Sequence, residues 1–341
     1  MPRCGVQFFP KELERVLAGF DIGTILRLHP LAGGNQRSPK VVIFSDKGRY
    51  LLKRRPKHKG DIDRVKFAHK VLKHLAAQGF PVTVVVPTVN SDETVLQMNN
   101  HIYELFEFVS GTRYDSSAEE TAEAARQLAN FHRLLADFPY EHEQTNNCFH
   151  NSRTVRSHLK TLRANNSTTP DRKLRTTADV LVRIYNESSI RINQLDFDSW
   201  PRQVIHGDWH PGNMLFSDGQ IVAVLDFDSV RIASPVTDLA NGLLQFSIVA
   251  GSPNPGDWPD SFDLEKISQF IRGYRSVNEL DKSKLDSLLD LMIETMIAEA
   301  VLPIVATGFF GNHSGTGFLE MILRKANWLN KNRDNIHFSS T

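Results

Sequence analysis

The most constraining feature of the sequence is a pair of apolar runs, each of which ends in a short cluster of polar residues. The first run leads into a His-x-Asp motif at residues 206–208, and Asn213 follows the aspartate by five positions. A polar turn at 217–220 leads into a second run that ends in Asp-Phe-Asp at 226–228. Because such a turn folds two runs back as a hairpin, Asn213 and Asp226 are expected to converge. An amide oxygen beside carboxylates suits a hard cation such as Mg²⁺.

The same spacing occurs in protein kinases, whose His-x-Asp loop is followed after five residues by asparagine and then by Asp-Phe-Gly. Here Asp228 replaces that glycine. With this change, the segment resembles the aminoglycoside phosphotransferase and choline kinase-like family of small-molecule kinases. The family signature is H-G-D-x-H-x-x-N, a strand ending in I-D-F-D or a variant, and D-x-A, which is supplied here by residues 238–240. The resemblance is strong over residues 204–240 and extends in outline over the whole chain.

The resemblance implies a role for each polar residue of the motif. Asp208 would be the catalytic residue that accepts or orients the substrate hydroxyl as it attacks the γ-phosphate of ATP. Asn213 and Asp226 would hold Mg²⁺ on the phosphates. Asp228 would reach a second metal or the substrate. His206 and Asp238 would support the loop from behind by hydrogen bonding.

The implied fold class is α+β, a two-lobed protein-kinase-like fold. A length of 341 residues favours two domains on its own. Residues 1–109 would form a nucleotide-binding lobe, a small antiparallel sheet with one helix. Residues 110–341 would form a larger, mainly helical lobe that carries the catalytic loop and the acceptor pocket.

Apolar periodicity and turn residues locate the individual elements. Strands are expected at 41–44, 49–53, 83–89, 102–108, 204–205 and 221–227. Helices are expected at 61–77, 118–136, 152–164 and 172–195, and again from 238 and from 264 onward. The apolar stretch 300–310 contains a proline and a glycine, and we interpret it as a buried helix end or a turn in the core.

The nucleotide-binding residues are predicted by position. Gly33, Gly34 and Asn35 stand where the family has a short loop that covers phosphate, and adjacent glycines let backbone N–H groups approach an anion. Lys53 ends a strand where kinases place the lysine that pairs with the α- and β-phosphates, and Arg55 shares its side of the strand. Glu107 and Val109 would lie in the hinge whose backbone meets adenine.

One departure from the kinase pattern concerns the acid that normally pairs with this lysine. The helix expected at 61–77 contains no glutamate, and Ala68 stands at the position of the acid. The spore-coat-associated, CotS-like branch of the family has similar helices without this acid. The sequence therefore leaves the partner of Lys53 open.

Charge and composition exclude several classes of protein. The chain carries 40 Lys plus Arg and 39 Asp plus Glu, which does not favour a nucleic-acid or membrane binder. Two cysteines fit no zinc pattern or disulfide framework, and the start of the sequence has no signal-peptide core, so a cytoplasmic protein is expected. Residues 1–80 carry 17 basic and 6 acidic residues, which is consistent with a polyphosphate ligand.

The acceptor is expected to be a small molecule. Residues 236–300 carry 5 basic and 11 acidic residues. If some of these acids line the acceptor pocket, they would favour an amino alcohol, an amino sugar or a sugar over organic acids. The acids that could do so are Asp257, Asp260, Asp263 and Glu265.

Three alternatives remain open at this point. A protein kinase has the same loop spacing, although the sequence lacks the glycine of Asp-Phe-Gly and an Ala-Pro-Glu segment. A non-catalytic, nucleotide-binding or structural kinase-like protein would bind nucleotide without turnover. A metal-dependent hydrolase could use the His-x-Asp-x-His run, but it would need further histidine ligands downstream.

Overall fold

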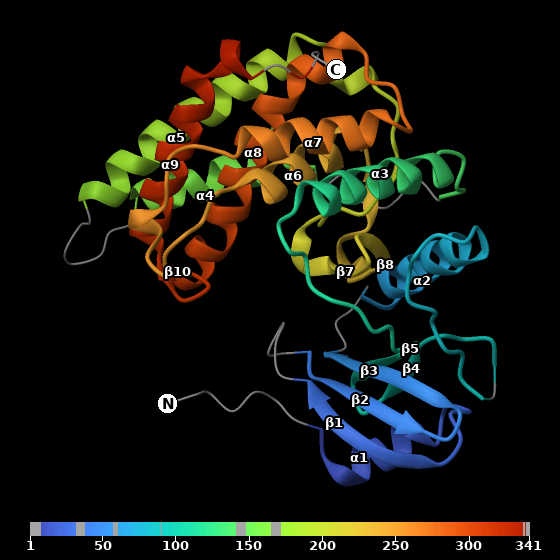
Figure 1. The fold of residues 1–341 in the computed structure, drawn as a ribbon. Coiled ribbons are helices and arrows are strands. Elements are labelled where there is room, and N and C mark those ends of the chain that lie inside the picture. Colours follow the sequence, from blue (N-terminus) through green and yellow to red (C-terminus); the bar gives the residue numbers. More distant parts are fainter. Residues whose placement is uncertain are drawn as a thin grey trace. The chain divides into compact units, whose positions relative to one another are not determined.

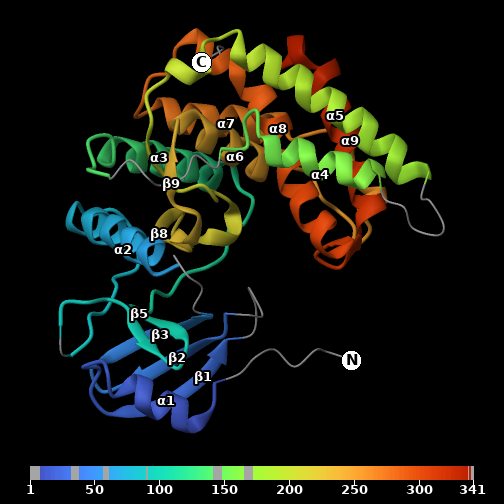
Figure 2. The same ribbon diagram turned by 180° about the vertical axis from the view of Figure 1, so that it is seen from behind.

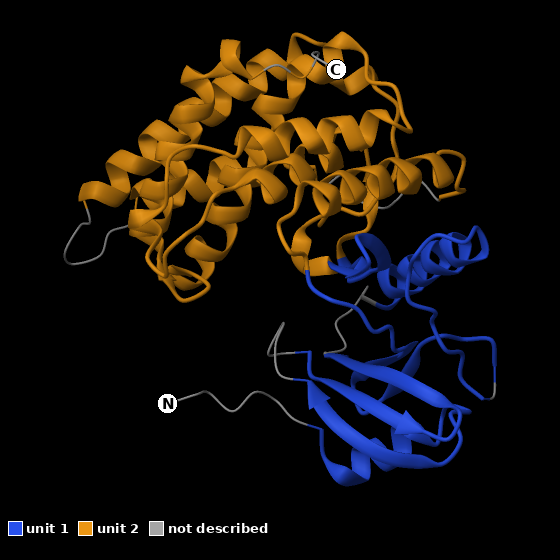
Figure 3. Ribbon diagram, viewed as in Figure 1, with its two compact units in different colours: residues 1–113, 214–228 blue, residues 114–213, 229–341 orange. Residues whose placement is uncertain are grey.

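The computed structural model describes residues 8–31, 38–56, 61–89, 91–140, 148–164, 172–336 and 338. The chain divides into two compact units (Figure 3). Unit 1 comprises residues 1–113 and 214–228, and unit 2 comprises 114–213 and 229–341. The hairpin after the His-x-Asp loop (residues 206–213) thus groups with unit 1. The predicted domain boundary after residue 109 stays a prediction.

A five-stranded antiparallel sheet forms the centre of unit 1 (Figure 1). Its strand order is β1-β2-β3-β5-β4. The predicted hairpin around residues 45–48 and the predicted strand at 102–108 are confirmed. The strands are β1 (Ile25–Leu31), β2 (Lys40–Ser45), β3 (Gly48–Pro56), β4 (Leu96–Met98) and β5 (His101–Glu107).

Helix α1 (Pro10–Leu17) covers one face of this sheet. Its apolar side packs against alternate residues of the strands, among them Ile43, Leu52 and Leu105, in one buried cluster. Arg54 points to this face as well and forms an ion pair with Glu12 of α1 at 2.5 Å. Because side chains alternate along a strand, Lys53 and Arg55 point to the opposite face.

Helix α2 (Asp61–Ala77) has the bounds predicted from the sequence. Its apolar side includes Val65, which packs against Val95 and Ile102. The expected strand at 83–89 is wrong: only isolated bridges form there, from Val82 and Val85. The second strand that pairs with β5, besides β3, is instead β4, which is too short to show a clear alternating pattern.

The hairpin of unit 1 consists of β7 (Met214–Ser217) and β8 (Gln220–Val224). Its two turn residues, Asp218 and Gly219, both have positive φ, as a two-residue turn between twisted strands requires. Strand β8 ends at Val224 rather than at residue 227 as predicted. The chain instead takes a left-handed conformation at Asp226, with φ of 59°, and a 3-10 turn follows at Phe227–Ser229.

Unit 2 consists mainly of helices, and the predicted helical segments after residue 117 are confirmed. A two-stranded sheet of β6 (Gln203–Ile205) and β9 (Arg231–Ala233) flanks the His-x-Asp loop. A second short pair, β10 (Phe309–Phe310) and β11 (His313–Ser314), follows the longest helix. The helices are α3 (Ala118–Leu134), α4 (Arg153–Ala164), α5 (Arg172–Asn193), α6 (Pro235–Ser247), α7 (Leu264–Arg275), α8 (Lys282–Thr307) and α9 (Gly315–Lys331).

Helix α8 is the core helix of unit 2. It is buried on nearly all sides and packs against α4, α5, α6 and α9, which Figure 2 shows from behind. Asp281 caps its first turn by accepting a hydrogen bond from the amide of Lys284, and Gly308 ends it with a left-handed φ of 79°. In the described part of the chain, none of the helices combines the length and apolarity needed to cross a membrane.

Helices α3 and α7 approach each other so closely that a glycine lies at their contact. A Cβ atom added at Gly273 would lie 2.2 Å from the carbonyl oxygen of Ala122. Backbone atoms cannot move aside as the end of a flexible side chain can, so any side chain at this position must separate the two helices.

We therefore predict that Gly273→Ala lowers the free energy of unfolding by about 1–3 kcal/mol, the usual effect of overpacking. The matched control is Gly317→Ala in α9, where a new Cβ meets no atom within 4 Å. That change should raise the free energy of unfolding by about 0.5–1 kcal/mol, because alanine favours helix over glycine. Urea denaturation of both variants measures the difference. Equal stabilities would contradict the close approach.

Candidate active site

The His-x-Asp loop is fixed from behind by one buried carboxylate. Asp238, in the first turn of α6, is 1% exposed and accepts hydrogen bonds from the backbone amides of His206 (2.7 Å) and Gly207 (2.8 Å). His132 of α3 lies 3.4 Å from the same carboxylate. Burial alone would raise the pKa of Asp238, but the hydrogen bond and charge of His132 outweigh it, so the pKa is lowered. The loop therefore rests on an ionised group.

A glycine is required at position 207 for two reasons. Its φ is +77°, and a Cβ atom there would lie 2.0 Å from Nη1 of Arg231. That Nη1 donates hydrogen bonds to the carbonyl oxygens of Gly207 and Ser229, each at 3.1 Å. Arg231, in β9, thus holds the loop from the side opposite to its amide contacts.

Asp208 is held in the ionised state by its neighbours. Burial raises the pKa of its carboxyl, but hydrogen bonding and charge from His210, together with His206 and Asn213, lower it further than burial raises it. Nε2 of His210 lies 3.6 Å from Oδ2 of Asp208. An ionised carboxylate can accept a proton or a hydrogen bond from a hydroxyl group.

The orientation of Asn213 follows from its contacts with Asp208. Its Nδ2 donates to the backbone oxygen and to Oδ2 of Asp208, both at 3.0 Å. Since the amide nitrogen faces Asp208, the amide oxygen is the end that faces away from it. Oxygen is the end that a hard cation binds.

Unit 1 brings Lys53 to the two carboxylates of the Asp-Phe-Asp motif. Lys53 of β3 is 6% exposed, and its Nζ lies 2.7 Å from Oδ2 of Asp228 and 3.3 Å from Oδ1 of Asp226. Arg55 donates from Nη2 to Asp228 as well. Burial opposes ionisation of Asp228, but these two cations lower its pKa to about 2. Asp228 is therefore a charge partner of Lys53 and Arg55, while Asp226 contacts only one cation, Lys53, among the described residues.

The partner of Lys53 that the sequence left open is thus the Asp-Phe-Asp motif, and the neighbouring strand supplies a further acid, which pairs with Arg55. Glu104 of β5 stands opposite Lys53 in the sheet register and is 1% exposed. It accepts from Nε of Arg55 at 2.5 Å and lies 2.9 Å from Nε2 of His69 on α2. Burial raises the pKa of Glu104, but His69 and Arg55 lower it overall. His69, the residue after Ala68, thus links α2 to Glu104 and Arg55. In the kinase pattern a glutamate of this helix makes the corresponding link.

The backbone at Asp226 differs from an ordinary strand end. Its φ of 59° is rare for a residue other than glycine, and asparagine or aspartate tolerates it best. Asp226 keeps carboxylate oxygens for a further ligand, since its side chain is 38% exposed and its contact with Lys53 involves Oδ1. Carboxylate and amide oxygens, such as those of Asp226 and Asn213, are each of the kind that Mg²⁺ binds, and their joint use as ligands stays a prediction. The described residues include no cluster of three or more His, Cys, Asp or Glu suited to a metal.

The predicted nucleotide-binding residues are only partly described. Gly33, Gly34 and Asn35 lie outside the described residues. Glu107 ends β5, and its amide donates to the carbonyl oxygen of Val84 at 2.9 Å. Val109 follows in an irregular, half-buried segment. Their roles in binding adenine remain predictions.

The acids proposed for the acceptor pocket have other partners. Asp260 pairs with Arg324 at 2.7 Å, and Asp263 caps α7 by accepting from the amide of Lys266. Asp257 accepts hydrogen bonds from Ser252 and Asn254 within its own loop. Glu265 lies in the first turn of α7. Three of these four carboxylates thus contribute to local structure, and a role of the four in an acceptor pocket stays a prediction.

Sequence reasoning missed Arg231, Glu104 and His69. Arg231 is a single basic residue in a short strand, which carries no motif. Glu104 could have been predicted from the strand register. It stands opposite Lys53 in the β3–β5 pair, so its side chain lies on the same face of the sheet as those of Lys53 and Arg55. His69 is one of 13 histidines and has no distinguishing pattern.

Comparison with known proteins is consistent with this geometry. A homoserine kinase of Xanthobacter autotrophicus is 28% identical over 230 residues, which cover 64% of this chain and 64% of the relative. The chain thus matches somewhat less than two thirds of that relative's length.

Two solved structures share the fold. The aminoglycoside phosphotransferase of Alicyclobacillus acidocaldarius has a TM-score of 0.68 at 18% identity, covering 98% of both chains. A microcompartment-associated aminopropanol kinase has a TM-score of 0.69 at 13% identity, covering 96% of this chain and 98% of the other. These similarities confirm the kinase-like α+β fold expected from the sequence.

The sequence profile of the phosphotransferase enzyme family (APH) matches residues 27–280, a range that includes the His-x-Asp loop, the hairpin and Asp238. Because this match covers well over half of the sequence, the chain belongs to the phosphotransferase enzyme family.

Proposed function

We propose that the protein is an ATP-dependent phosphotransferase that moves the γ-phosphate to a hydroxyl group of a small molecule. The observation that carries this proposal is the arrangement around Asp208. The amide of Asn213 holds the Asp208 carboxylate from one side, and the buried Asp238 holds the preceding backbone from the other. A positioned, ionised aspartate beside an asparagine oxygen is what transfer of phosphate to a hydroxyl requires.

In this proposal Asp208 receives the acceptor. Its carboxylate accepts a hydrogen bond from the hydroxyl group, orients the oxygen toward the γ-phosphorus, and takes the proton as the new P–O bond forms. Phosphoryl transfer has a loose transition state, so this positioning counts for more than removal of the proton. His206, whose Nδ1 accepts from the amide of Asp208 at 3.3 Å, supports the backbone of the loop.

The nucleotide side of the proposal uses the residues of unit 1. Asn213 and Asp226 would hold Mg²⁺ through their free oxygens, and the cation would neutralise charge on the β- and γ-phosphates. Lys53 would contact the α- and β-phosphates, and Asp228 would keep Lys53 and Arg55 in position rather than act as the main metal ligand. Gly33, Gly34, Asn35, Glu107 and Val109 complete the proposed ATP site.

The acceptor is proposed to be a small amino alcohol, amino sugar or sugar. The names of two similar proteins, a homoserine kinase and an aminopropanol kinase, support an acceptor that carries an amino group beside the hydroxyl. The use of ATP supports a cytoplasmic location. Transfer to a generic protein substrate instead would favour the protein-kinase alternative.

Replacement of Asp208 tests the catalytic role. We expect Asp208→Asn to lower kcat by about 10²- to 10⁴-fold, because the amide cannot accept the proton. Affinity for ATP should change little, since Asp208 contacts the acceptor rather than the phosphates. Asp137→Asn, at an exposed position of the same unit, is the control and should keep full activity. Release of ADP with an acceptor panel measures kcat, and an unaltered rate in the Asp208 variant would refute the assignment.

Replacement of Asp226 tests the metal site. Mg-ATP at a hundred times its dissociation constant should stabilise the protein by about 2.7 kcal/mol, and Asp226→Asn should remove most of the resulting rise in Tm. Asparagine tolerates the left-handed φ of this position, so the Tm without ligand should stay close to that of the wild type.

Asp218→Asn is the matched control for this experiment, because Asp218 lies in the same hairpin and also has positive φ, 51°. It should retain the whole Mg-ATP shift. A shift that persists in the Asp226 variant, or one that survives EDTA, would argue against the proposed ligands.

A further inference from the structure

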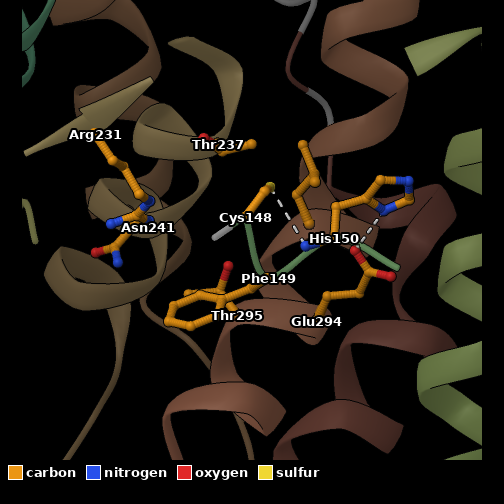
Figure 4. Close-up of a pocket in the computed structure, with 9 residues that line it drawn as sticks. Cys148, Phe149, His150, Arg231, Thr237, Asn241, Glu294 and Thr295 are labelled. Atoms are coloured by element: carbon orange, nitrogen blue, oxygen red, sulfur yellow. Dashed lines mark hydrogen bonds and ion pairs between the residues drawn. The ribbon is translucent and has the colours of Figure 1, made fainter. Parts of the chain in front are cut away.

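A polar pocket opens beside the His-x-Asp loop within unit 2 (Figure 4). It is formed by the segment 148–150, β9, α6 and α8. One side is fully paired: His150 lies 2.8 Å from Glu294, which also accepts hydrogen bonds from Ser189 and from the amide of Asn151. The lining residues are Cys148, Phe149, His150, Arg231, Thr237, Asn241, Leu291, Glu294 and Thr295.

The opposite side of the pocket carries a hydrogen-bond acceptor without a donor. Asn241 of α6 is 3% exposed, and its Nδ2 donates to Oε1 of Glu299 at 3.0 Å. This contact fixes the amide nitrogen toward Glu299, so Oδ1 must face elsewhere. Oδ1 is buried and has no hydrogen-bond partner among the described residues. A buried acceptor left unpaired costs about 1–3 kcal/mol, which a ligand with a donor group would recover.

A donor without an acceptor lies on the same side. Arg231 lines the same pocket as Asn241, and Figure 4 draws both side chains across the pocket from Glu294 in this view. The Nη1 atom of Arg231 holds the His-x-Asp loop, whereas its Nε is buried and has no hydrogen-bond partner within the described part of the chain. Oδ1 of Asn241 and Nε of Arg231 together favour a ligand that carries both a hydrogen-bond donor and an oxygen acceptor.

The charges around Asn241 select among such ligands. Glu299 of α8 also accepts from Nε2 of Gln245 at 2.8 Å. Burial, together with the charge of Asp208, raises the pKa of Glu299 to about 7, while Asn241, His210 and Arg231 act against the rise. Glu299 and Asp208 thus share one electrostatic environment. A cation placed there would relieve the repulsion between the two carboxylates, whereas an acidic group would be repelled by them and attracted to Arg231 and His210.

We propose that this pocket binds the acceptor as a small hydroxylated amino acid, with its ammonium group at Asn241 Oδ1 and Glu299 and its carboxylate at Arg231 Nε. The inference rests on the proposed phosphotransferase activity of Asp208 and names the class of acceptor for that site. It makes Asn241 and Glu299 specificity-determining residues. A compound that lacks the ammonium group leaves Asn241 unpaired, and one that lacks the carboxylate leaves Arg231 unpaired.

Four acceptors of similar length separate the two groups: homoserine with both, 3-amino-1-propanol with the ammonium alone, 4-hydroxybutanoate with the carboxylate alone, and 1-propanol with neither. For the wild type we expect kcat/KM to fall by about 10- to 100-fold for each missing group, as the loss of a partner for a buried polar atom predicts. A wild type that phosphorylates all four with similar kcat/KM would overturn the inference.

Glu299→Gln is the main variant, because it keeps the size of the side chain and removes only the charge. It should reduce the ratio of kcat/KM between homoserine and 4-hydroxybutanoate by about tenfold or more, with KM for ATP unchanged. Asn241→Leu should act in the same direction. Glu320→Gln on α9, where the half-exposed carboxylate pairs with Lys173 at 3.8 Å, is the control and should leave the ratio unaltered. An equal loss for both acceptors in Glu299→Gln would overturn the inference.

The pH profile gives a second readout that a purely structural role would not alter. As the pH rises from 6 to 8, Glu299 becomes ionised and attracts the ammonium group more strongly, so the same ratio should rise in the wild type. In Glu299→Gln the ratio should change much less with pH. His210 acts on Glu299 as well as on Asp208, so any change with pH that both proteins share is assigned to groups other than Glu299. The acceptor ammonium stays charged over this range.

Calorimetric binding of homoserine to the full chain separates this inference from the proposed function. Binding that is weakened in Glu299→Gln and Asn241→Leu but not in Glu320→Gln supports the pocket even if no acceptor is phosphorylated, and in that event only the proposed function fails. Absence of binding in the wild type, with another acceptor phosphorylated, overturns the pocket alone. A melting temperature recorded for each variant ensures that the comparison is made between folded proteins.

Discussion

The site in unit 2 depends on one buried charge, the carboxylate of Asp238. A carboxylate with 1% exposure is costly unless several groups compensate it, and here two loop amides and His132 do so. Its place in the first turn of α6 adds the favourable interaction of an anion with a helix N-terminus. The helix therefore sets the position of the His-x-Asp loop, and Asp208 receives its orientation from a residue that never meets substrate.

Unit 1 has a corresponding network, in which two cations lie between three carboxylates. Lys53 and Arg55 point to the same face of β3 and contact Asp228, while Glu104 compensates Arg55 from the neighbouring strand. Because each ion has an oppositely charged neighbour, the charges can be buried at tolerable cost. Asp226 is the least engaged member of this network, which is why it is the better proposed metal ligand of the two.

Much of this arrangement could be predicted from the sequence, because local patterns determine it. The His-x-Asp loop, the hairpin and helix α2 follow from apolar periodicity and turn residues. Two predictions of strands were wrong, in one case in the whole segment and in the other in the position of the strand's end. The segment 83–89 has strand-like residues but pairs only at isolated bridges, and Asp226 ends β8 early through its backbone conformation.

Partners that are distant in the sequence could not be predicted, because local patterns carry no information about them. Nothing local to Asp257 or Asp260 reveals that nearby side chains occupy them, and nothing local to Asn241 reveals an oxygen without a partner. Glu104 is the exception, since the strand register links it to Lys53. The substrate pocket is assembled from segments about 150 residues apart, such as Cys148 and Thr295, which no motif connects.

Helix α6 has a consequence for how this protein could change over evolution. Asp238 and Asn241 are separated by one helical turn, so the loop anchor and the proposed substrate contact share a rigid element. A substitution that shifts α6 to fit a new substrate would also displace Asp208. Helix α8 presents Leu291, Thr295 and Glu299 at four-residue intervals, and none of them holds the loop. New substrate preferences should therefore arise through α8, while α6 stays nearly invariant among functional descendants of this chain.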